Sequence, residues 1–394
     1  MRREKKPSHR LANRVITTAF CVGLVAVSTV NALTPSKEFS ENENRTLQQM
    51  PEFKMDEFLE GKYGEKIDKY ISDQFLMRDT FISLKAVMEK ALFKTENKGT
   101  YFGKDNYLIQ IPAEVADPST FNPQVEKNNI EAIRKLAELG TYQVDFLLAP
   151  TSFEIMQDKL PDHAYTDQQL QLMQRVKEGL DGSGVTVIDP TEELRAHKEE
   201  QQVYYRTDHH WTTYGAYLAY TQLGDALGFT PYEMDDFQVE KLSDEFYGTL
   251  WSKATLPSFP ADTIEAYIPK EQMNYTVEFL GEGGSMEGLY AMDKLETKDK
   301  YSVFLDGNHS YVHIASSNQN GKKLFVIKDS YAHALVPFLA NHYQDIYMLD
   351  MRYFNGDARQ LIDQSGCTDV LFIYNCENFK TDNNLVKITV NLDK

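Results

Sequence analysis

The chain has 394 residues, of which 42% are hydrophobic and 12% aromatic, and it carries a formal net charge of −18. This apolar content is enough to bury a large core and excludes a disordered chain, so one large or two modest domains are expected. The acidic balance argues against nucleic acid as a partner, because phosphate binding needs clustered lysine and arginine side chains.

The N-terminal segment differs from the rest of the chain in charge and hydropathy. Six basic residues and one acid lie in residues 1–14, and residues 15–33 hold no charged side chain. This stretch approaches the roughly 20 residues that a helix needs to cross a bilayer, and basic residues before it predict a cytoplasmic N-terminus. Residues 1–34 are therefore predicted to be a basic stub and a signal anchor. The rest of the chain is then exported and held at the cell membrane by a single pass.

A cleaved signal peptide is the alternative for the same segment. Val30-Asn31-Ala32 places small residues at the −3 and −1 positions of a cleavage site, which predicts secretion after cleavage near Ala32. Residues 34–50 are polar and are predicted to form an extended linker.

Hydrophobic patterns after the linker predict alternating helices and strands. Apolar residues at three- and four-residue spacing predict helices within residues 52–92, and Asp105-Asn106 marks the turn of a hairpin over residues 99–110. Residues 229–300 are hard to assign and are predicted to be irregular. The other predicted elements are helices at 124–139, 166–181, 213–227, 330–343 and 356–365, and strands at 142–150, 184–190, 322–329, 345–350 and 369–375.

Strands of continuous apolar character between helices predict a mainly parallel sheet that is covered on both faces. We expect residues 36–394 to form a three-layer α/β/α domain, preceded by the N-terminal hydrophobic helix. Ligands of such sheets bind at the carboxyl ends of the strands, so polar residues that follow those ends are candidate site residues.

Three residues in two segments offer the parts of a nucleophilic site. The segment TDHHWTTYGA (207–216) contains Asp208 and His210, whose spacing lets the carboxylate fix the imidazole and stabilise its cation. Ser330 follows the predicted strand LFVIKD and begins a helix, where free backbone N–H groups favour negative charge. A serine needs a base within hydrogen-bond reach to act as a nucleophile. Asp208, His210 and Ser330 are therefore the predicted catalytic residues.

Simpler interpretations exist for each part. Ser330 alone fits a helix N-cap, and His209 fits a packed or exposed loop residue. His333, one turn after Ser330, is predicted to be exposed on its helix. Asp208, His209 and His210 are competent metal ligands, but adjacent histidines suit one ion poorly and no second ligand cluster stands out. No metal and no cofactor are predicted.

Further residues are candidates for the walls of the pocket. The oxyanion or pocket candidates are Gly307, Asn308, Asn375, Glu377 and Tyr331, and the alternative for the first two is a plain turn. Trp251 and Tyr247 are candidates for stacking on sugar rings, although aromatic side chains are more often core.

At these residues the chain resembles the bacterial DHHW protein family, in the alginate O-acetyltransferase-like branch of the SGNH hydrolase superfamily. The resemblance covers most of residues 36–394. It rests on FSENENRTL (39–47), YISDQFLMRD (70–79), YFGKDNYL (101–108), TDHHWTTYGA (207–216), GTLWSKA (248–254) and KDSYAHALVPFL (328–339). In the related acetyltransferases the Asp-x-His motif precedes the serine motif, and this chain has the same order. His209 departs from those relatives, which often carry a small polar residue there.

The resemblance implies an SGNH-like fold and an exported serine-dependent O-acetyltransferase or esterase, with Asp208, His210 and Ser330 as its triad. The implied partners are an acetylated cell-envelope or exported polysaccharide and a membrane-bound acyl-donor protein. The alternative is an inactive SGNH-like protein that binds glycans or assists assembly.

Overall fold

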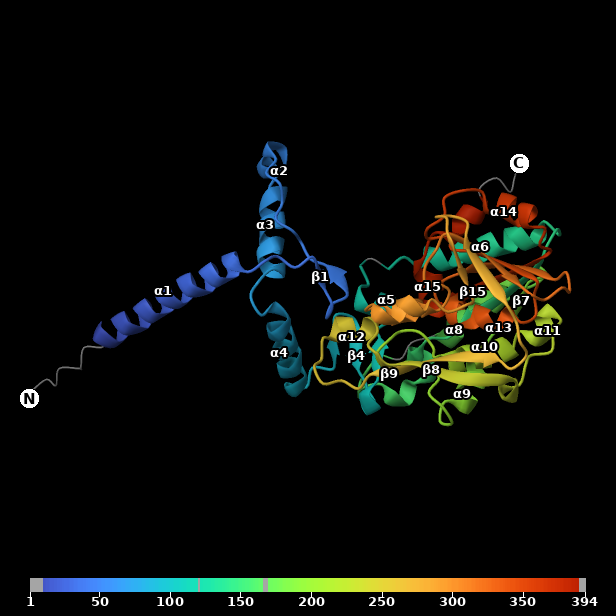
Figure 1. Ribbon diagram of the computed structural model, residues 1–394, viewed down its shortest axis with the longest axis horizontal. Coiled ribbons are helices and arrows are strands. Elements are labelled where there is room, and N and C mark those ends of the chain that lie inside the picture. The colour runs from blue at the N-terminus through green and yellow to red at the C-terminus, as the bar shows by residue number, and fades with distance from the viewer. Residues whose placement is uncertain (1–9, 120, 166–168, 390–394) are drawn as a thin grey trace, which may run out of the picture. The chain divides into compact units, whose positions relative to one another are not determined.

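The computed structural model describes residues 10–119, 121–165 and 169–389, and its chain divides into two compact units, Met1–Leu92 and Phe93–Lys394 (Figure 1). The sequence predicts a boundary at residues 34–36, between a membrane segment and an exported domain. The boundary after Leu92 separates two units that pack separately, and it does not test the predicted one. The boundary at residues 34–36 stays a prediction.

The first unit is helical and begins with a long apolar helix. Helix α1 (Arg10–Leu33) contains a segment, Ala12–Leu33, that is long and apolar enough to cross a membrane. The segment predicted to be a linker holds one short antiparallel pair of strands, β1 (Phe39–Ser40) and β2 (Arg45–Thr46). The helices predicted within residues 52–92 are α2 (Met55–Leu59), α3 (Lys62–Asp73) and α4 (Arg78–Ala91).

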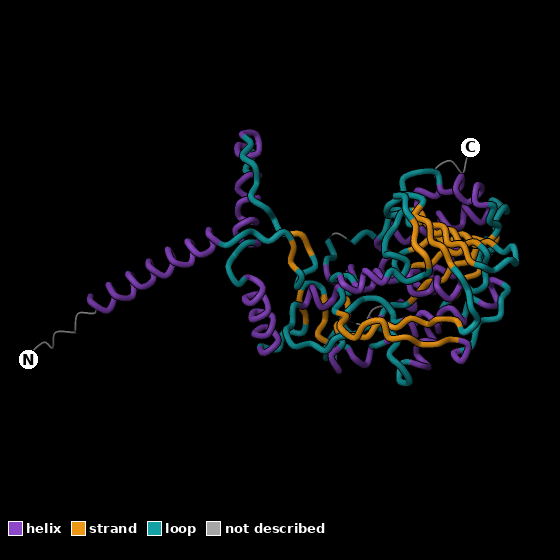
Figure 2. The backbone as a smooth tube through the Cα atoms, viewed as in Figure 1, coloured by secondary structure: helices purple, strands orange, loops and turns teal. Residues whose placement is uncertain are grey.

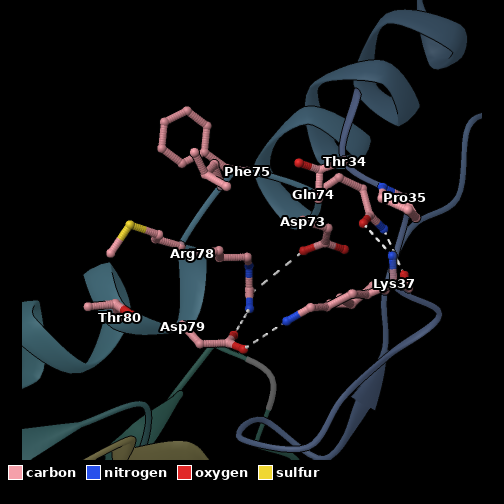
Figure 3. Close-up of a pocket in the computed structure, with 12 residues that line it drawn as sticks. Thr34, Pro35, Lys37, Asp73, Gln74, Phe75, Arg78, Asp79 and Thr80 are labelled. Atoms are coloured by element: carbon pink, nitrogen blue, oxygen red, sulfur yellow. Dashed lines mark hydrogen bonds and ion pairs between the residues drawn. The ribbon is translucent and has the colours of Figure 1, made fainter. Parts of the chain in front are cut away.

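Ion pairs join the β1–β2 segment to the turn between α3 and α4. Arg45 binds the buried carboxylate of Asp73 with both terminal nitrogens, and Arg78 pairs with Glu43. Figure 3 shows Asp73 and Arg78 in a cavity of about 350 Å³ that Thr34 and Pro35 also line. The hydrogen bonds from Arg45, outweighing the effect of burial, lower the pKa of Asp73 to about 2. Asp73 is therefore ionised at neutral pH, and the cluster holds the linker on the helices.

The second unit is built on an eight-stranded mixed sheet with the order β11-β10-β12-β14-β13-β15-β6-β7. The five strands from β14 to β7 are parallel, and β12, β10 and β11 add an antiparallel edge. The strands in this order are Ser285–Glu287, Tyr275–Phe279, Tyr311–Ser316, Asp345–Leu349, Lys323–Lys328, Asp369–Asn375, Gln143–Ala149 and Thr186–Ile188.

Successive residues of the central strands pack into two different cores. On β6, Phe146 and Leu148 lie in a cluster with helices α6, α8, α14 and α15, while Leu147 and Ala149 lie in a cluster with α10 and α13. Both faces of the sheet are therefore covered by helices, and the predicted three-layer arrangement with a mainly parallel sheet is confirmed (Figure 1). The helices are α6 (Gln124–Glu138), α8 (Gln169–Leu180), α10 (Thr213–Thr221), α13 (Ala332–Leu339), α14 (Ala358–Ser365) and α15 (Cys376–Thr381).

Smaller elements surround this core. The predicted hairpin is β4 (Thr100–Phe102) and β5 (Leu108–Gln110), and both turn residues have positive φ. Strand β3 (Glu96–Asn97) extends it. The short helices are α5 (Ala113–Ala116), α7 (Ser152–Ile155), α9 (Thr191–His197), α11 (Gly224–Leu227), α12 (Thr249–Ala254), and the 3-10 helices η1 (Lys104–Asn106), η2 (Gln157–Lys159), η3 (Met234–Asp236), η4 (Met292–Glu296), η5 (Lys300–Val303) and η6 (Leu385–Thr389).

Two predictions of secondary structure are wrong in this unit. The helix predicted at 213–227 is broken into α10 and α11. The region 229–300, predicted to be irregular, contains a long antiparallel ribbon, β8 (Phe237–Phe246) and β9 (Asp262–Pro269), as well as β10 and β11 (Figure 2). Most of β8 is exposed, and the ribbon has irregular register, so its sequence lacks the alternation of a half-buried strand. The first residues of the helix predicted at 166–181 lie outside the described residues.

Asp145 on β6 is expected to make stability fall as pH rises. Its carboxylate is buried, and this burial outweighs the opposing effect of Thr186 and Gln143 and raises its pKa to about 6. Its unfolded pKa is about 3.9, so between about pH 4 and 6 the unfolded state binds fewer protons than the folded state. Asp145→Asn should raise the free energy of unfolding at pH 7 by on the order of 2 kcal/mol.

Urea unfolding between pH 4 and pH 8 measures this effect. The stability gained by Asp145→Asn should be small at pH 4 and full above pH 6. Asp235→Asn, at an exposed position, removes the same charge and is the control. An equal gain at both ends of the pH range would contradict the expectation.

Candidate active site

The TDHHW loop is a tight hairpin that is held at both sides. Tyr204 pairs with Trp211, and the Tyr204 hydroxyl donates to the carbonyl of Pro150, which directly follows β6. The buried carboxylate of Asp262 accepts hydrogen bonds from the N–H groups of Arg206 and Thr207 and from the Thr207 hydroxyl. After the loop, the Thr212 hydroxyl accepts a hydrogen bond from the N–H of Gly215 and caps α10. The hairpin is therefore fixed next to the carboxyl end of the sheet.

Ser330 lies in the turn between the central strand β13 and α13. The preceding residue, Asp329, is fully buried and accepts hydrogen bonds from the N–H of Tyr331, from the N–H and side-chain amide of Asn375, and from the side-chain amide of Asn378. These bonds tie the turn to the end of β15, the neighbouring strand. Ser330 does not cap α13 with its side chain, so the hydroxyl is available for another partner.

The structure brings the three predicted residues into one hydrogen-bonded line. His210 Nδ1 lies 2.5 Å from Asp208 Oδ1, and His210 Nε2 lies 2.7 Å from Ser330 Oγ. Asp208 and His210 are 2% and 5% exposed, while Ser330 is 8% exposed. The nucleophile candidate is thus the least buried of the three. This is the order that lets a substrate reach the hydroxyl while the carboxylate stays away from water.

Charges around the triad favour an ionised Asp208. Burial alone raises the pKa of Asp208, but the two neighbouring histidines and the hydrogen bonds from His210 and the Thr249 N–H bring it well below its usual value. Burial, with a contribution from His210, lowers the pKa of His209 to about 3, so His209 is neutral at neutral pH. Ionised Asp208 accepts from His210 Nδ1–H, which leaves Nε2 to accept the proton of the Ser330 hydroxyl.

Two contacts that support the triad are absent from the sequence prediction. The ring of Tyr301, from η5, stacks on the His210 ring with centroids 3.8 Å apart and planes 8° apart, and its hydroxyl donates to the carbonyl of Ser330. The N–H of Thr249 donates to Asp208 Oδ2 at 2.7 Å. Thr249 lies in GTLWSKA, one of the segments in which the chain resembles the DHHW family, whereas nothing in the sequence marks Tyr301.

Gly248 allows this approach of Thr249 to Asp208. A Cβ atom at position 248 would lie 2.3 Å from both the Cβ and the Oδ2 atoms of Asp208. Its backbone conformation is open to any residue, so the requirement for glycine comes from the close approach alone.

The remaining pocket candidates lie around the triad rather than on it. The hydroxyl of Tyr331 donates to the carbonyl of His209. Asn375 caps α15 and holds Asp329, and Glu377 accepts from the Ala113 N–H and pairs with Lys380. Through these contacts the three residues hold backbone groups and side chains near the triad in place. Their predicted role in lining the pocket stays a prediction.

Gly307 closes a turn that begins at Phe304, and Asn308 directly follows it. Gly307 has a φ of +81°, its N–H donates to Phe304, and the Asn308 side chain accepts from Arg352. By contrast, the N–H of Ser330 has no hydrogen-bond partner among the described residues. It is therefore a donor next to the nucleophile that can face a developing oxyanion.

The two proposed stacking residues already hold a cation. The rings of Tyr247 and Trp251 lie 4.9 Å apart, and Lys298 Nζ lies 4.3 Å from the Trp251 ring centroid. A sugar ring would have to share or displace that contact, so stacking stays a prediction.

His333 corrects an expectation. It was expected to be exposed, but it is 2% exposed and its Nε2 accepts from the buried ammonium of Lys328, which also pairs with Asp350. Continuous packing of α13 on the sheet buries this position. His333 therefore belongs to a buried polar cluster behind the Ser330 turn.

Asp208, His209 and His210 also satisfy the distances of a metal site, because one ligand atom from each lies within 4.8 Å of the others. Both nitrogens of His210 face Asp208 and Ser330, however, so a cation there would have to displace the triad hydrogen bonds. The arrangement suits proton transfer better than metal binding.

Comparison with known proteins supports the fold. Residues 140–349 match the DHHW protein family. A probable alginate O-acetylase AlgJ of Pseudomonas syringae pv. tomato is 24% identical over 54% of this chain and 52% of its own length, and the Azotobacter vinelandii protein of that name is 22% identical over 43% and 44%. The chain spans about half the length of these curated relatives.

Two solved structures have the same fold as the second unit. A DHHW family protein of Eubacterium siraeum superposes with a TM-score of 0.62 and 23% identity, covering 75% of this chain and 96% of that one. PatB1 of Bacillus cereus superposes with a TM-score of 0.60 and 23% identity, covering 71% and 97%. The SGNH-like α/β fold predicted from the sequence is therefore confirmed.

Gly248→Ala is expected to displace Asp208 and slow the reaction of Ser330. The added Cβ cannot fit beside the carboxylate, and a misplacement of about 1 Å costs on the order of a hundredfold in rate. The rate at which a sulfonyl fluoride modifies Ser330, followed by mass spectrometry, measures the effect. Thr249→Ser keeps both the N–H and a hydroxyl and should react at the normal rate. A normal rate in Gly248→Ala would contradict the assigned role of this close approach.

Proposed function

We propose that this chain, which belongs to the DHHW protein family, is a serine-dependent O-acyl transferase or esterase acting on acetyl groups of a cell-envelope or exported polysaccharide. The observation that supports this proposal best is the hydrogen-bonded line from Asp208 through His210 to Ser330. The names of the relatives, probable alginate O-acetylases, support the acetyl group and the polysaccharide.

In this proposal, the triad carries out both halves of acyl transfer. Ser330 Oγ attacks the acetyl carbonyl and gives its proton to His210 Nε2, while Asp208 stabilises the imidazolium. The carbonyl oxygen becomes negative opposite the N–H of Ser330. The intermediate then expels the donor alcohol, which takes the proton from His210 and leaves acetyl-Ser330. A sugar hydroxyl or water next gives its proton to His210 and attacks the acetyl carbon, and the intermediate then expels Ser330 Oγ, which takes the proton back from His210.

The apolar helix α1 supports a location at the cell membrane. In our proposal α1 is a single-pass anchor, the basic N-terminal residues stay in the cytoplasm, and the second unit acts outside the cell. A membrane-bound protein would then deliver the acyl group, because acetyl donors are made inside the cell. Cleavage near Ala32 is the alternative, and it would release the same catalytic unit.

Ser330→Ala is expected to remove acetyl ester turnover. Loss of the nucleophile in a triad lowers turnover on the order of a thousandfold or more. Hydrolysis of p-nitrophenyl acetate measures this, and mass spectrometry of the quenched enzyme should find an acetyl group on Ser330. Ser285→Ala, on the exposed edge strand β11, is the matched control.

Two outcomes separate the alternatives. Equal turnover by the parent chain and Ser330→Ala would refute the enzyme and leave a glycan-binding or assembly protein. If Ser330 is acetylated, adding an oligosaccharide acceptor distinguishes the reactions, because a transferase acetylates the sugar while an esterase releases acetate.

A further inference from the structure

The end of α1 is bonded directly to the turn between α3 and α4. Asn31, in the last turn of α1, accepts a hydrogen bond from the N–H of Leu76 at 2.7 Å. Thr34 and Pro35, which follow α1, line the cavity of Figure 3 together with residues 73–80. We call residues 74–77 the elbow. It lies against the end of the apolar helix.

Several bonds hold the linker on this elbow. Gln74 accepts from the N–H of Lys37 and donates to the carbonyls of Lys37 and Gln48. The Arg45–Asp73 and Arg78–Glu43 pairs lie beside it. The two ion pairs join FSENENRTL to YISDQFLMRD, two segments that have no part in the catalytic site. The segment after α1 is therefore fixed, and it sets the position of α4 relative to the end of α1.

Within the first unit, helix α4 presents an apolar stripe that is largely exposed. Met77, Phe81, Leu84 and Met88 recur at three- and four-residue spacing, and each is at least 52% exposed. Leu92, just after the helix, continues the stripe and is 77% exposed. Ala86, on the opposite side of α4, is buried. A contiguous apolar patch on one helix face marks a site of interaction with a protein or a membrane.

We infer that the apolar stripe of α4 lies in the outer headgroup layer of the bilayer that α1 crosses. The 22 residues of Ala12–Leu33 span about 33 Å as a helix, which matches the hydrocarbon core. The last turn of α1 and the elbow bonded to it then lie at the membrane surface. The stripe begins at Met77, next to the bonded Leu76, so it begins at the depth where amphipathic helices insert.

The same contacts favour retention of α1. Cleavage after Ala32 would remove Asn31 and leave the N–H of Leu76 without this partner. The inference rests on the single-pass topology proposed above, and it does not depend on the chemistry at Ser330.

Quenching of a fluorophore on α4 tests the inference. The full chain carries Cys21→Ala, and Cys367 and Cys376 are buried, so a new cysteine is the site of labelling. Phe81→Cys and Leu84→Cys place the dye on the stripe, and Lys90→Cys places it on an exposed position of another face of α4. Each labelled chain is inserted, one copy a disc, into nanodiscs of phosphatidylethanolamine and phosphatidylglycerol. Some of the lipids carry a nitroxide near the headgroup.

The dye at positions 81 and 84 should be quenched several-fold more by the nitroxide lipid than the dye at position 90, and several-fold less by aqueous iodide. Iodide quenching at 81 equal to that at 90 would overturn the inference, because the stripe would then lie in water. Protection from both quenchers would also overturn it and would assign the stripe to a protein surface.

Two further measurements on the same samples separate this inference from the proposed function. Release of the chain by alkaline carbonate would refute the anchor, and the inference would fall with it. If the dye on the stripe is strongly quenched by lipid but the chain shows no Ser330-dependent ester turnover, the proposed catalytic function is refuted and the membrane inference stands.

Discussion

Buried aspartates that accept hydrogen bonds from loop amides hold the catalytic end of the sheet together. Asp262 binds the N–H groups of Arg206 and Thr207 at the start of the TDHHW loop. Asp329 binds the turn of Ser330 to the end of β15, and Asp208 accepts from the N–H groups of His210 and Thr249. A buried carboxylate is costly unless such bonds satisfy it. Each buried aspartate is therefore stable only while its loop keeps the conformation that presents these N–H groups. The N–H groups of the loop in turn need the carboxylate as their acceptor.

This requirement explains how residues 120 positions apart meet within hydrogen-bond distance. His210 and Ser330 come from different loops, and neither loop belongs to a helix or strand that would fix it. The aspartate bonds supply that fixation, while the Tyr301 ring sets the plane of the imidazole. The fold places the loops at one edge, and the bonds among them provide the accuracy that proton transfer requires.

The sequence was sufficient to predict the parts of the site that depend on residues close together along the chain. Asp208 and His210 are two residues apart, and Ser330 follows a strand whose apolar residues are continuous, so both loops were predictable. The five parallel strands and the helices between them were predictable for the same reason, whereas the antiparallel edge of the sheet was not. Thr249 was marked only by its place in GTLWSKA. Tyr301 and Asp262 were not predictable, because their proximity to the triad depends on the path of the chain through β8, β9 and the residues after them. That ribbon is largely exposed and irregular in register, so its sequence carries no clear periodicity. The burial of His333 likewise follows from packing rather than from the helix pattern.

The two edges of the large sheet are both short. Strands β11 and β7 contain three residues each, so few unpaired backbone groups are presented at either side. A long open edge would be a template for pairing with another chain. Short edge strands present little of such a template, so copies of this chain have few backbone groups through which their large sheets could pair.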